Sequence, residues 1–163
     1  MTEVAGALPR PVFVAPWSSE VVTWSHTRGQ LVLRHDNGQS TVVVLQRCTA
    51  GRLRHSYPVG VRDIEIRLPD RVGDRELSAA LRAVVAGIRV AEPQCRKVVY
   101  AVDVDASGGG PTHGDRATIA AVEAAGFRSV VDVDIADAEL SLLVSEPEWV
   151  TQVDIDLDRI PGS

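Results

Sequence analysis

The sequence predicts a mixed α/β fold in which helices cover a largely antiparallel sheet. The first sixty residues have the pattern of short strands separated by turns, and a helical period of apolar residues begins near residue 74. From there on, strand patterns and helix patterns alternate. A strand–helix–strand crossover of this kind normally places its two strands in parallel, so we expect one parallel pair within the sheet.

Alternating apolar and polar residues, rich in valine, mark the strands of the first half. Asn37-Gly38 lies between two such runs and accommodates the positive φ angles of a tight hairpin. The last run stops at Pro69, and no long helical period precedes residue 74. The strands expected here are residues 21–24, 30–35, 41–46 and 63–68.

In the second half, apolar residues repeat at helical spacing over 77–88, and Asp74 can cap the start of that helix. A nearly continuous apolar run at 97–103 is typical of a strand covered on both faces. A second helix over about 115–125 ends at Gly126, a natural left-handed stop. The remaining strands expected are residues 128–135, 139–144 and 153–157.

Acidic residues outnumber basic ones by 22 to 17, for a net charge of −5. This balance argues against binding to nucleic acid, where clustered positive charge supplies the affinity. The sequence shows no signal-peptide pattern and no apolar run approaching the roughly 20 residues that span a bilayer, so we expect a cytoplasmic protein without membrane contact. Cys48 and Cys95 make no disulfide framework and are expected to be buried thiols.

Three stretches resemble the GNAT (GCN5-related N-acetyltransferase) superfamily. Residues 63–75, with the helix after them, resemble its fourth strand, phosphate loop and third helix. Residues 118–127 resemble its penultimate helix with the Gly-Phe ending, and residues 127–147 resemble its closing β-hairpin. The resemblance implies a mixed, largely antiparallel GNAT-like sheet flanked by two main helices.

The resemblance also implies one GNAT-like domain over residues 1–163. We divide it into a β-rich N-terminal part at 1–60, a cofactor-binding-like core at 61–147 and a C-terminal strand extension at 148–163. Full-length family members place two helices between their first two strands. The first sixty residues here contain no pattern for such helices, so the acceptor side is missing, remodelled or completed by a partner chain.

The family binds acetyl-CoA or another acyl-CoA in a gap between two splayed parallel strands, which are here the strands around 63–68 and 98–104. Its diphosphate lies on backbone N–H groups at the start of the following helix. The matching positions are Arg71, Val72, Gly73, Asp74 and Arg75. Of the family's glycine pattern only the central Gly73 is present, and Arg75 must point out of the gap if the cofactor is to enter. The alternative for the whole loop is an ordinary capped helix start.

Direct acyl transfer needs a base for the amine and an acid for the departing thiolate. Glu65 matches the position of the family's base; the alternative is an exposed residue of an alternating strand. The family's acid is a tyrosine at the position of Val122, which cannot donate a proton. Tyr100 on the neighbouring strand is the candidate substitute, and a tyrosine at the edge of the core is its alternative.

Other patterns have simpler interpretations. The aspartates over 154–158 alternate with apolar residues and would lie on the solvent-exposed face of an expected strand. The histidines lack metal-ligand spacing, so no metal is expected. The glycines over 107–111 form a lid beside the gap or a flexible loop. One basic patch could contact a CoA phosphate or an acidic partner, or be a solvated loop; it comprises Arg47, Arg52, Arg54 and His55.

Two functions remain open. The first is a CoA-dependent N-acyltransferase that moves an acyl group to an amine on a small molecule or a protein. The second is a catalytically inactive GNAT-like module that dimerises, binds a partner protein or senses CoA. Trp149 and the acidic C-terminal strand favour the interaction hypothesis, since Trp is enriched at interface hot spots.

Overall fold

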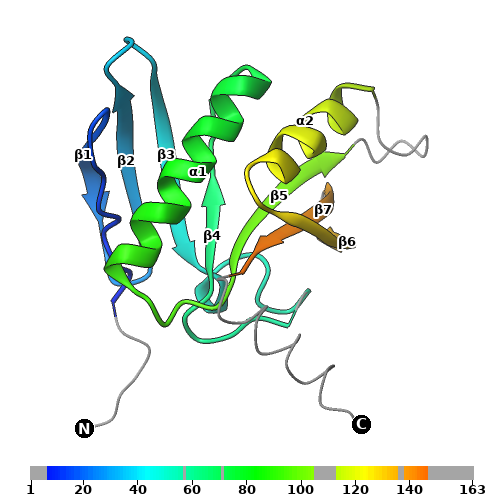
Figure 1. Ribbon diagram of the computed structural model, residues 1–163. Coiled ribbons are helices and arrows are strands. Elements are labelled where there is room, and N and C mark those ends of the chain that lie inside the picture. Colours follow the sequence, from blue (N-terminus) through cyan, green and yellow to red (C-terminus); the bar gives the residue numbers. More distant parts are fainter. Residues whose placement is uncertain (1–6, 57, 71, 105–112, 136–137, 147–163) are drawn as a thin grey trace, which may run out of the picture.

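The computed structural model describes residues 7–56, 58–70, 72–104, 113–135 and 138–146. Within these ranges, seven strands form one sheet in the order β1-β2-β3-β4-β5-β7-β6, with two α-helices on one face (Figure 1). The strands are β1 (Trp17–Trp24), β2 (Arg28–His35), β3 (Ser40–Arg47), β4 (Ile64–Arg67), β5 (Val98–Val104), β6 (Arg128–Ile135) and β7 (Ala138–Ser145). The helices are α1 (Asp74–Ala91), α2 (His113–Ala124) and a 3-10 turn, η1 (Cys48–Ala50).

All strand pairs are antiparallel except β4 and β5, which are parallel and joined through α1. The predicted fold class, a mixed and largely antiparallel sheet with two main helices, is therefore confirmed. The β-rich N-terminal part is confirmed as well, because β1 passes to β2 through residues 25–27, with no helix between them.

The hairpin between β2 and β3 turns where the sequence predicts. Gly38 has a φ of 97°, and its N–H donates to the His35 carbonyl at 2.9 Å. The Asn37 side-chain oxygen accepts the N–H of Gln39 at 2.8 Å. Glycine is needed here because other L-residues are strained at this φ, so this turn fixes the β2–β3 register.

The main core lies between α1 and the sheet. The buried face of α1 includes Leu77, Leu81, Val84 and Ile88, the positions that repeat at helical spacing in the sequence. They share one cluster with sheet residues such as Ile66. Burying each large aliphatic side chain contributes about 1.5–3 kcal/mol, so this face fixes α1 on β1–β4.

The second helix ends as predicted. Gly126 has a φ of 100°, and its N–H donates to the Glu123 carbonyl at 2.9 Å, while the Phe127 N–H donates to the Val122 carbonyl at 3.4 Å. This left-handed ending turns the chain directly into β6. Val122 and Phe127 are buried in the main core, so the family's tyrosine position is here a packing position.

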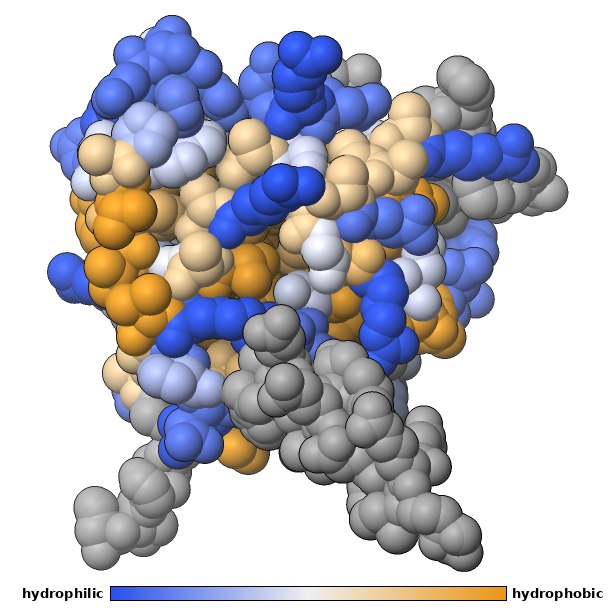
Figure 2. Space-filling view, viewed as in Figure 1, coloured by the Kyte–Doolittle hydropathy of each residue, from blue (hydrophilic) through white to orange (hydrophobic). Residues whose placement is uncertain are grey.

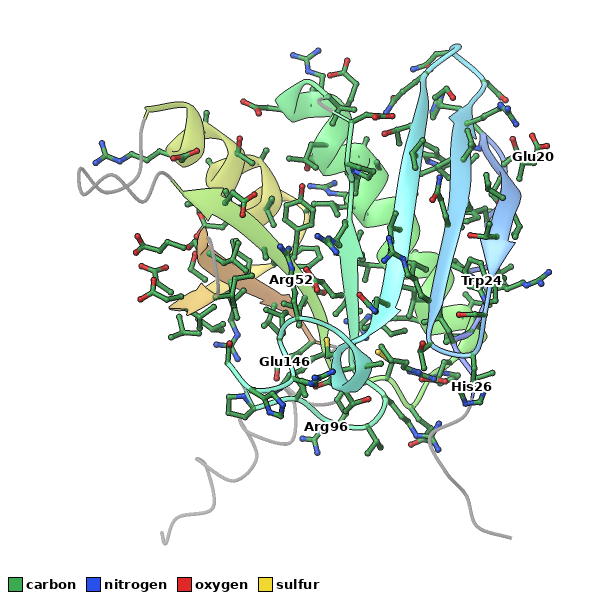
Figure 3. The ribbon with its side chains drawn as sticks, turned by 180° about the vertical axis from the view of Figure 1, so that it is seen from behind. Glu20, Trp24, His26, Arg52, Arg96 and Glu146 are labelled. Atoms are coloured by element: carbon green, nitrogen blue, oxygen red, sulfur yellow. The ribbon has the colours of Figure 1, made fainter. Side chains whose placement is uncertain are left out.

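A second, smaller cluster covers the opposite face of the sheet at β5 and β7. It joins Cys48 and Leu53 to apolar residues of those strands, and the loop after β3 lies over it (Figure 3). Cys48 and Cys95 are both free and buried, as predicted. Burial raises the pKa of both thiols, that of Cys95 to about 12, with the charge of Asp63 adding to the effect.

Three sequence predictions concern segments outside the described residues: the strand at 153–157, the glycine loop at 107–111 and Trp149. Among the helices that the structure does describe, none is long and apolar enough to cross a membrane.

Candidate functional site

The two parallel strands separate at one end. β4 and β5 pair only at Ile64↔Val98, Glu65↔Val99 and Ile66↔Tyr100, after which β4 ends at Arg67. β5 continues to Val104 with β7 as its partner on the other side. A cavity of about 600 Å³ opens where they part, and Figure 1 shows the two ribbons diverging. The predicted splay of these strands is present.

The separation has a local cause in the sequence. Leu68-Pro69 follows β4, and proline has no N–H to continue a ladder with β5. β5 keeps its direction because β7 pairs with it along its whole length. The gap is therefore lined by β4, β5, α2, β2, β3 and the loop after β3, through Arg28, Gln30, Val44, Arg52, Arg67, Leu68, Pro69, Tyr100, Ala101, Val102, Asp103, Asp115 and Thr118.

Tyr100 lines this gap from β5. Its side chain is 9% exposed and also packs in the main core. Burial raises the pKa of its hydroxyl, and the charge of Asp103 raises it further. The hydroxyl therefore keeps its proton at neutral pH, as a proton donor must.

Glu65 is buried, which excludes the alternative of an exposed strand residue. Its side chain is 1% exposed, and its Oε2 accepts from Arg52 Nε at 3.2 Å and Nη2 at 2.8 Å. Figure 3 shows Arg52 on the face of the sheet opposite the helices, between β4 and β5. Arg52 lines the gap and Glu65 does not, so the carboxylate lies behind the guanidinium.

The start of α1 differs in one detail from the prediction. Its N-cap is Gly73, and no side chain caps it; Asp74 is the first helical residue rather than the cap. The Leu77 N–H donates to the Gly73 carbonyl at 2.8 Å, while a Glu76 carboxylate oxygen lies against Gly73 where a Cβ would stand. A side chain at position 73 would displace the end of the flexible Glu76 side chain, while the φ of Gly73, −67°, is open to any residue.

The other residues of the predicted phosphate loop lie in different environments. Val72 is half-buried and packs against the main core, and Arg75 is exposed. Arg75 lines a groove on the outer side of α1 and is not among the residues lining the gap, so it leaves the gap open. Arg71 lies outside the described residues.

The groove holding Arg75 runs over both helices and measures about 1030 Å³. Alanines of α1 and α2 line much of it, together with Val12, Phe13 and Val14 of the N-terminal segment. Figure 2 shows the apolar surface that crosses this side of the molecule. Arg82 bridges the two helices by donating to the Ala124 carbonyl.

The described residues fit coenzyme A by shape. The gap can admit a slender pantetheine arm, and the uncapped end of α1 offers backbone N–H donors to a diphosphate. Charge favours the diphosphate less, because the carboxylates of Asp74 and Glu76 lie in the first turn with Arg75 between them. The fit of the arm is thus better than that of the diphosphate.

Three members of the basic patch predicted from the sequence, Arg52, Arg54 and His55, line one cavity, but the fourth, Arg47, is not part of it. Arg47 is 2% exposed and forms an ion pair with Glu92 at 2.9 Å, away from the gap. The arginines that do gather at the gap are Arg28, Arg52 and Arg67, from three separate segments. Sequence reasoning missed Arg28 and Arg67. The one available signal was that Arg67 shares its strand face with Glu65.

These features define a class of protein. A largely antiparallel seven-stranded sheet, one parallel pair that splays, and a helix that begins beside the opening constitute a GNAT-like fold.

Solved structures support that assignment. An uncharacterized protein from Bacillus halodurans matches at a TM-score of 0.59 and 18% identity over 75% of this chain, which spans 60% of that structure. The aminoglycoside acetyltransferase AAC(6')-Ib in complex with coenzyme A and kanamycin matches at a TM-score of 0.57 and 15% identity, covering 78% of this chain and 72% of that one. The same enzyme in complex with paromomycin and acetyl-CoA matches at a TM-score of 0.57 and 15% identity, covering 77% of this chain and 68% of that one.

Comparison of the sequence itself adds no closer relative. No family model matches the chain, and no curated protein matches it significantly. At these identities the structural likeness establishes the fold alone.

Proposed function

We propose that this protein binds an acyl-CoA and transfers its acyl group to an amine. The observation that carries the proposal is the gap between β4 and β5, which opens after three residue pairs and is free of Arg75. A sheet whose strands paired along their full length would leave no space for a thioester arm. The complexes of AAC(6')-Ib with coenzyme A and acetyl-CoA give the proposal further support.

The start of α1 would hold the cofactor's diphosphate. Backbone N–H groups at Asp74 and Arg75 lie in the uncapped first turn, where the helix dipole favours an anion. The Arg75 side chain would add a charge-assisted contact. When bound, an acyl-CoA supplies a thioester carbon whose bond to sulfur breaks as the bond to the amine nitrogen forms, with one proton leaving the nitrogen and one reaching the sulfur.

Tyr100 would donate the proton that the sulfur receives. It is the one tyrosine among the residues lining the gap, and its hydroxyl carries its proton at neutral pH, since burial raises a pKa that is already well above 7. Glu65 as the base is a further prediction. It requires that a bound acceptor draw Arg52 away from the carboxylate, since that ion pair shields it in this structure.

Calorimetry with acetyl-CoA and acetyl-pantetheine tests the binding step. Both ligands should bind, and Arg75→Glu should weaken acetyl-CoA about tenfold or more while leaving acetyl-pantetheine unchanged, because only the former has a diphosphate. Arg34→Glu, on the far β2 surface, is the matched control. Absence of any binding at millimolar concentration would refute the proposal.

Thiol release across an amine panel tests the transfer step. Tyr100→Phe should lower turnover about 100-fold or more with acetyl-CoA affinity unchanged, in keeping with the loss of a general acid. The basic limb of the pH profile should disappear in the same variant. A Tyr100→Phe enzyme with full turnover would remove this residue from the mechanism.

The inactive module remains the second candidate. The ion pair on Glu65 and the buried Val122 at the family's tyrosine position favour it. A CoA sensor would bind acetyl-CoA and release no thiol with any amine, whereas a dimerisation or partner-binding module would not need the ligand.

A further inference from the structure

We propose that the gap takes an anionic acceptor: a small amine that also carries a carboxylate or phosphate group. This inference rests on the proposed function and names the substrate class of the same site. It is carried by the arrangement of charge around the gap.

Three guanidinium groups converge at this opening from distant parts of the chain. Arg28 begins β2, Arg52 lies in the loop after β3, and Arg67 ends β4. The loop and the two strand ends meet here because β2, β3 and β4 are neighbours in the sheet. No helix separates β1 from β2, and the Arg28 side chain is exposed.

The three arginines differ in what balances their charge. Arg52 donates to Glu65, so that pair is neutral overall. Among the described residues, no carboxylate pairs with Arg28 or Arg67. Two positive charges thus face the opening with no carboxylate of the described residues within ion-pair distance, although the cavity lining also includes Asp103 and Asp115.

A second cavity, of about 340 Å³, adjoins the first and shares Arg52 and Arg67 with it. Its other lining residues are Gln46, Ala50, Gly51, Arg54 and His55. None of the residues lining it is acidic. An anion placed here would contact guanidinium groups, which are well suited to bidentate hydrogen bonds with a carboxylate or a phosphate.

The opposite wall of the gap has the opposite charge. Asp103 on β5 and Asp115 on α2 line it there, beside Tyr100. An acceptor with an amine at one end and an anion at the other matches this polarity: its nitrogen faces β5, where the candidate acid lies, and its anion faces Arg28 and Arg67. Polycationic amines such as aminoglycosides would instead meet like charge at the arginine wall.

Matched pairs of small amines test the inference. Phosphoethanolamine is compared with ethanolamine, and β-alanine with β-alaninamide, by calorimetry on the CoA-free protein and by thiol release with acetyl-CoA. The anionic member of at least one pair should bind about tenfold or more tightly than its neutral partner and be acetylated preferentially, and the two pairs distinguish phosphate from carboxylate. Kanamycin serves as the cationic comparator.

Arg67→Gln and Arg28→Gln should each reduce the preference for the anionic amine by about tenfold. The control is Arg34→Gln, which lies on the same strand as Arg28 but forms an exposed ion pair with Glu20. Thermal unfolding of each variant separates lost binding from lost folding.

Equal binding of both members of both pairs, or an anion preference that survives Arg67→Gln and Arg28→Gln together, would overturn the inference. Preferential use of kanamycin would do the same. Anion binding without acetyl-CoA binding would support the pocket and refute the acyltransferase, so the two failures can be told apart.

Discussion

The two ends of the β4–β5 pair differ in how their polar groups are satisfied. The closed end is where the strands begin, around Asp63 and Lys97; the open end is where they part, beyond Arg67 and Tyr100. At the closed end, polar groups bond to one another within the protein. At the open end, two arginines face a cavity with no carboxylate partner in the described chain.

Asp63 organises the closed end. Its carboxylate is buried and accepts the N–H of Gly60 at 2.7 Å and that of Lys97 at 3.2 Å. Its own carbonyl accepts the Cys48 N–H at 3.0 Å, and the Ile64 N–H donates to the Lys97 carbonyl at 3.2 Å. One aspartate therefore joins the end of β3 to the starts of β4 and β5.

Arg47 strengthens the same end with a buried ion pair. Its guanidinium donates to both oxygens of Glu92, at 2.9 and 3.0 Å, and to the carbonyls of Arg62 and Ala7. These contacts tie β3 to the end of α1 and to the N-terminal segment. The difference between the ends is therefore one of pairing: the buried charges of the closed end are paired within the protein, and the two arginines of the open end have no carboxylate partner among the described residues.

The largest expected effect is at the closed end. Arg47→Ala removes the bidentate partner of the largely buried Glu92 carboxylate and leaves it only Arg62 at 3.8 Å, so it should lower the free energy of unfolding by about 3 kcal/mol. Urea denaturation measures the loss. Arg34→Ala, whose ion pair with Glu20 has side chains 50% and 67% exposed, should cost about 0–1 kcal/mol. Similar losses in both variants would contradict the comparison.

The closed-end thiols predict an alkaline instability. The folded-state pKa values of Cys48 and Cys95 are raised above the ordinary value of 9.0, that of Cys95 to about 12, so the folded protein retains protons that the unfolded chain releases. The contribution of these two thiols to the free energy of unfolding is therefore constant well below pH 9 and falls above it, by about 1.4 kcal/mol per pH unit for each thiol.

Unfolding free energies at pH 8.5 and 10, under reducing conditions, test this. The double variant Cys48→Ala with Cys95→Ala should lose clearly less stability over that range than the natural chain. Equal losses would show that the thiols are not buried as described.

Asp63→Asn should lower the free energy of unfolding by about 2 kcal/mol. One of the two backbone N–H groups then donates to a neutral amide oxygen, and the other meets the NH₂ group of the asparagine, which cannot accept. Hydrogen exchange at the Lys97 amide should accelerate together with the loss. Asp36→Asn, in the exposed hairpin turn, is the control and should change stability little. Unchanged exchange at Lys97 would argue that Asp63 does not hold the strands together.

The smallest effect is expected at the open end. Arg67→Gln should change the free energy of unfolding by less than about 0.5 kcal/mol, since the guanidinium has no described carboxylate partner to lose. The same urea assay checks it. A loss as large as that of Asp63→Asn would make Arg67 structural and remove the contrast between the two ends.

The sequence predicted the elements well because local patterns determine them. The period of α1, the Asn37-Gly38 turn and the Gly126 helix end all depend on neighbours in the chain. The start of α1 was predicted less accurately. Asp74 has the side chain of a good cap, but Gly73 occupies the N-cap and Asp74 is the first helical residue.

The candidate site was predicted only in part, because its charge pattern depends on strand order. Arg47 and Arg52 are close in sequence, yet one binds Glu92 at the closed end and the other binds Glu65 at the gap. Arg28 joins that gap from a different strand. Nothing in the spacing of these residues reveals that three arginines meet, since sheet pairing brings them together.

The direct turn between β1 and β2 has a consequence for the order of folding. β1, β2 and β3 pair with their immediate neighbours in the chain, so this meander can form early through short loop closures. β4 and β5 can pair only after α1 has crossed between them, which is a slower, non-local event. Pulsed labelling during refolding should protect amides of the meander before those of β5, so the gap between β4 and β5 should assemble after the meander.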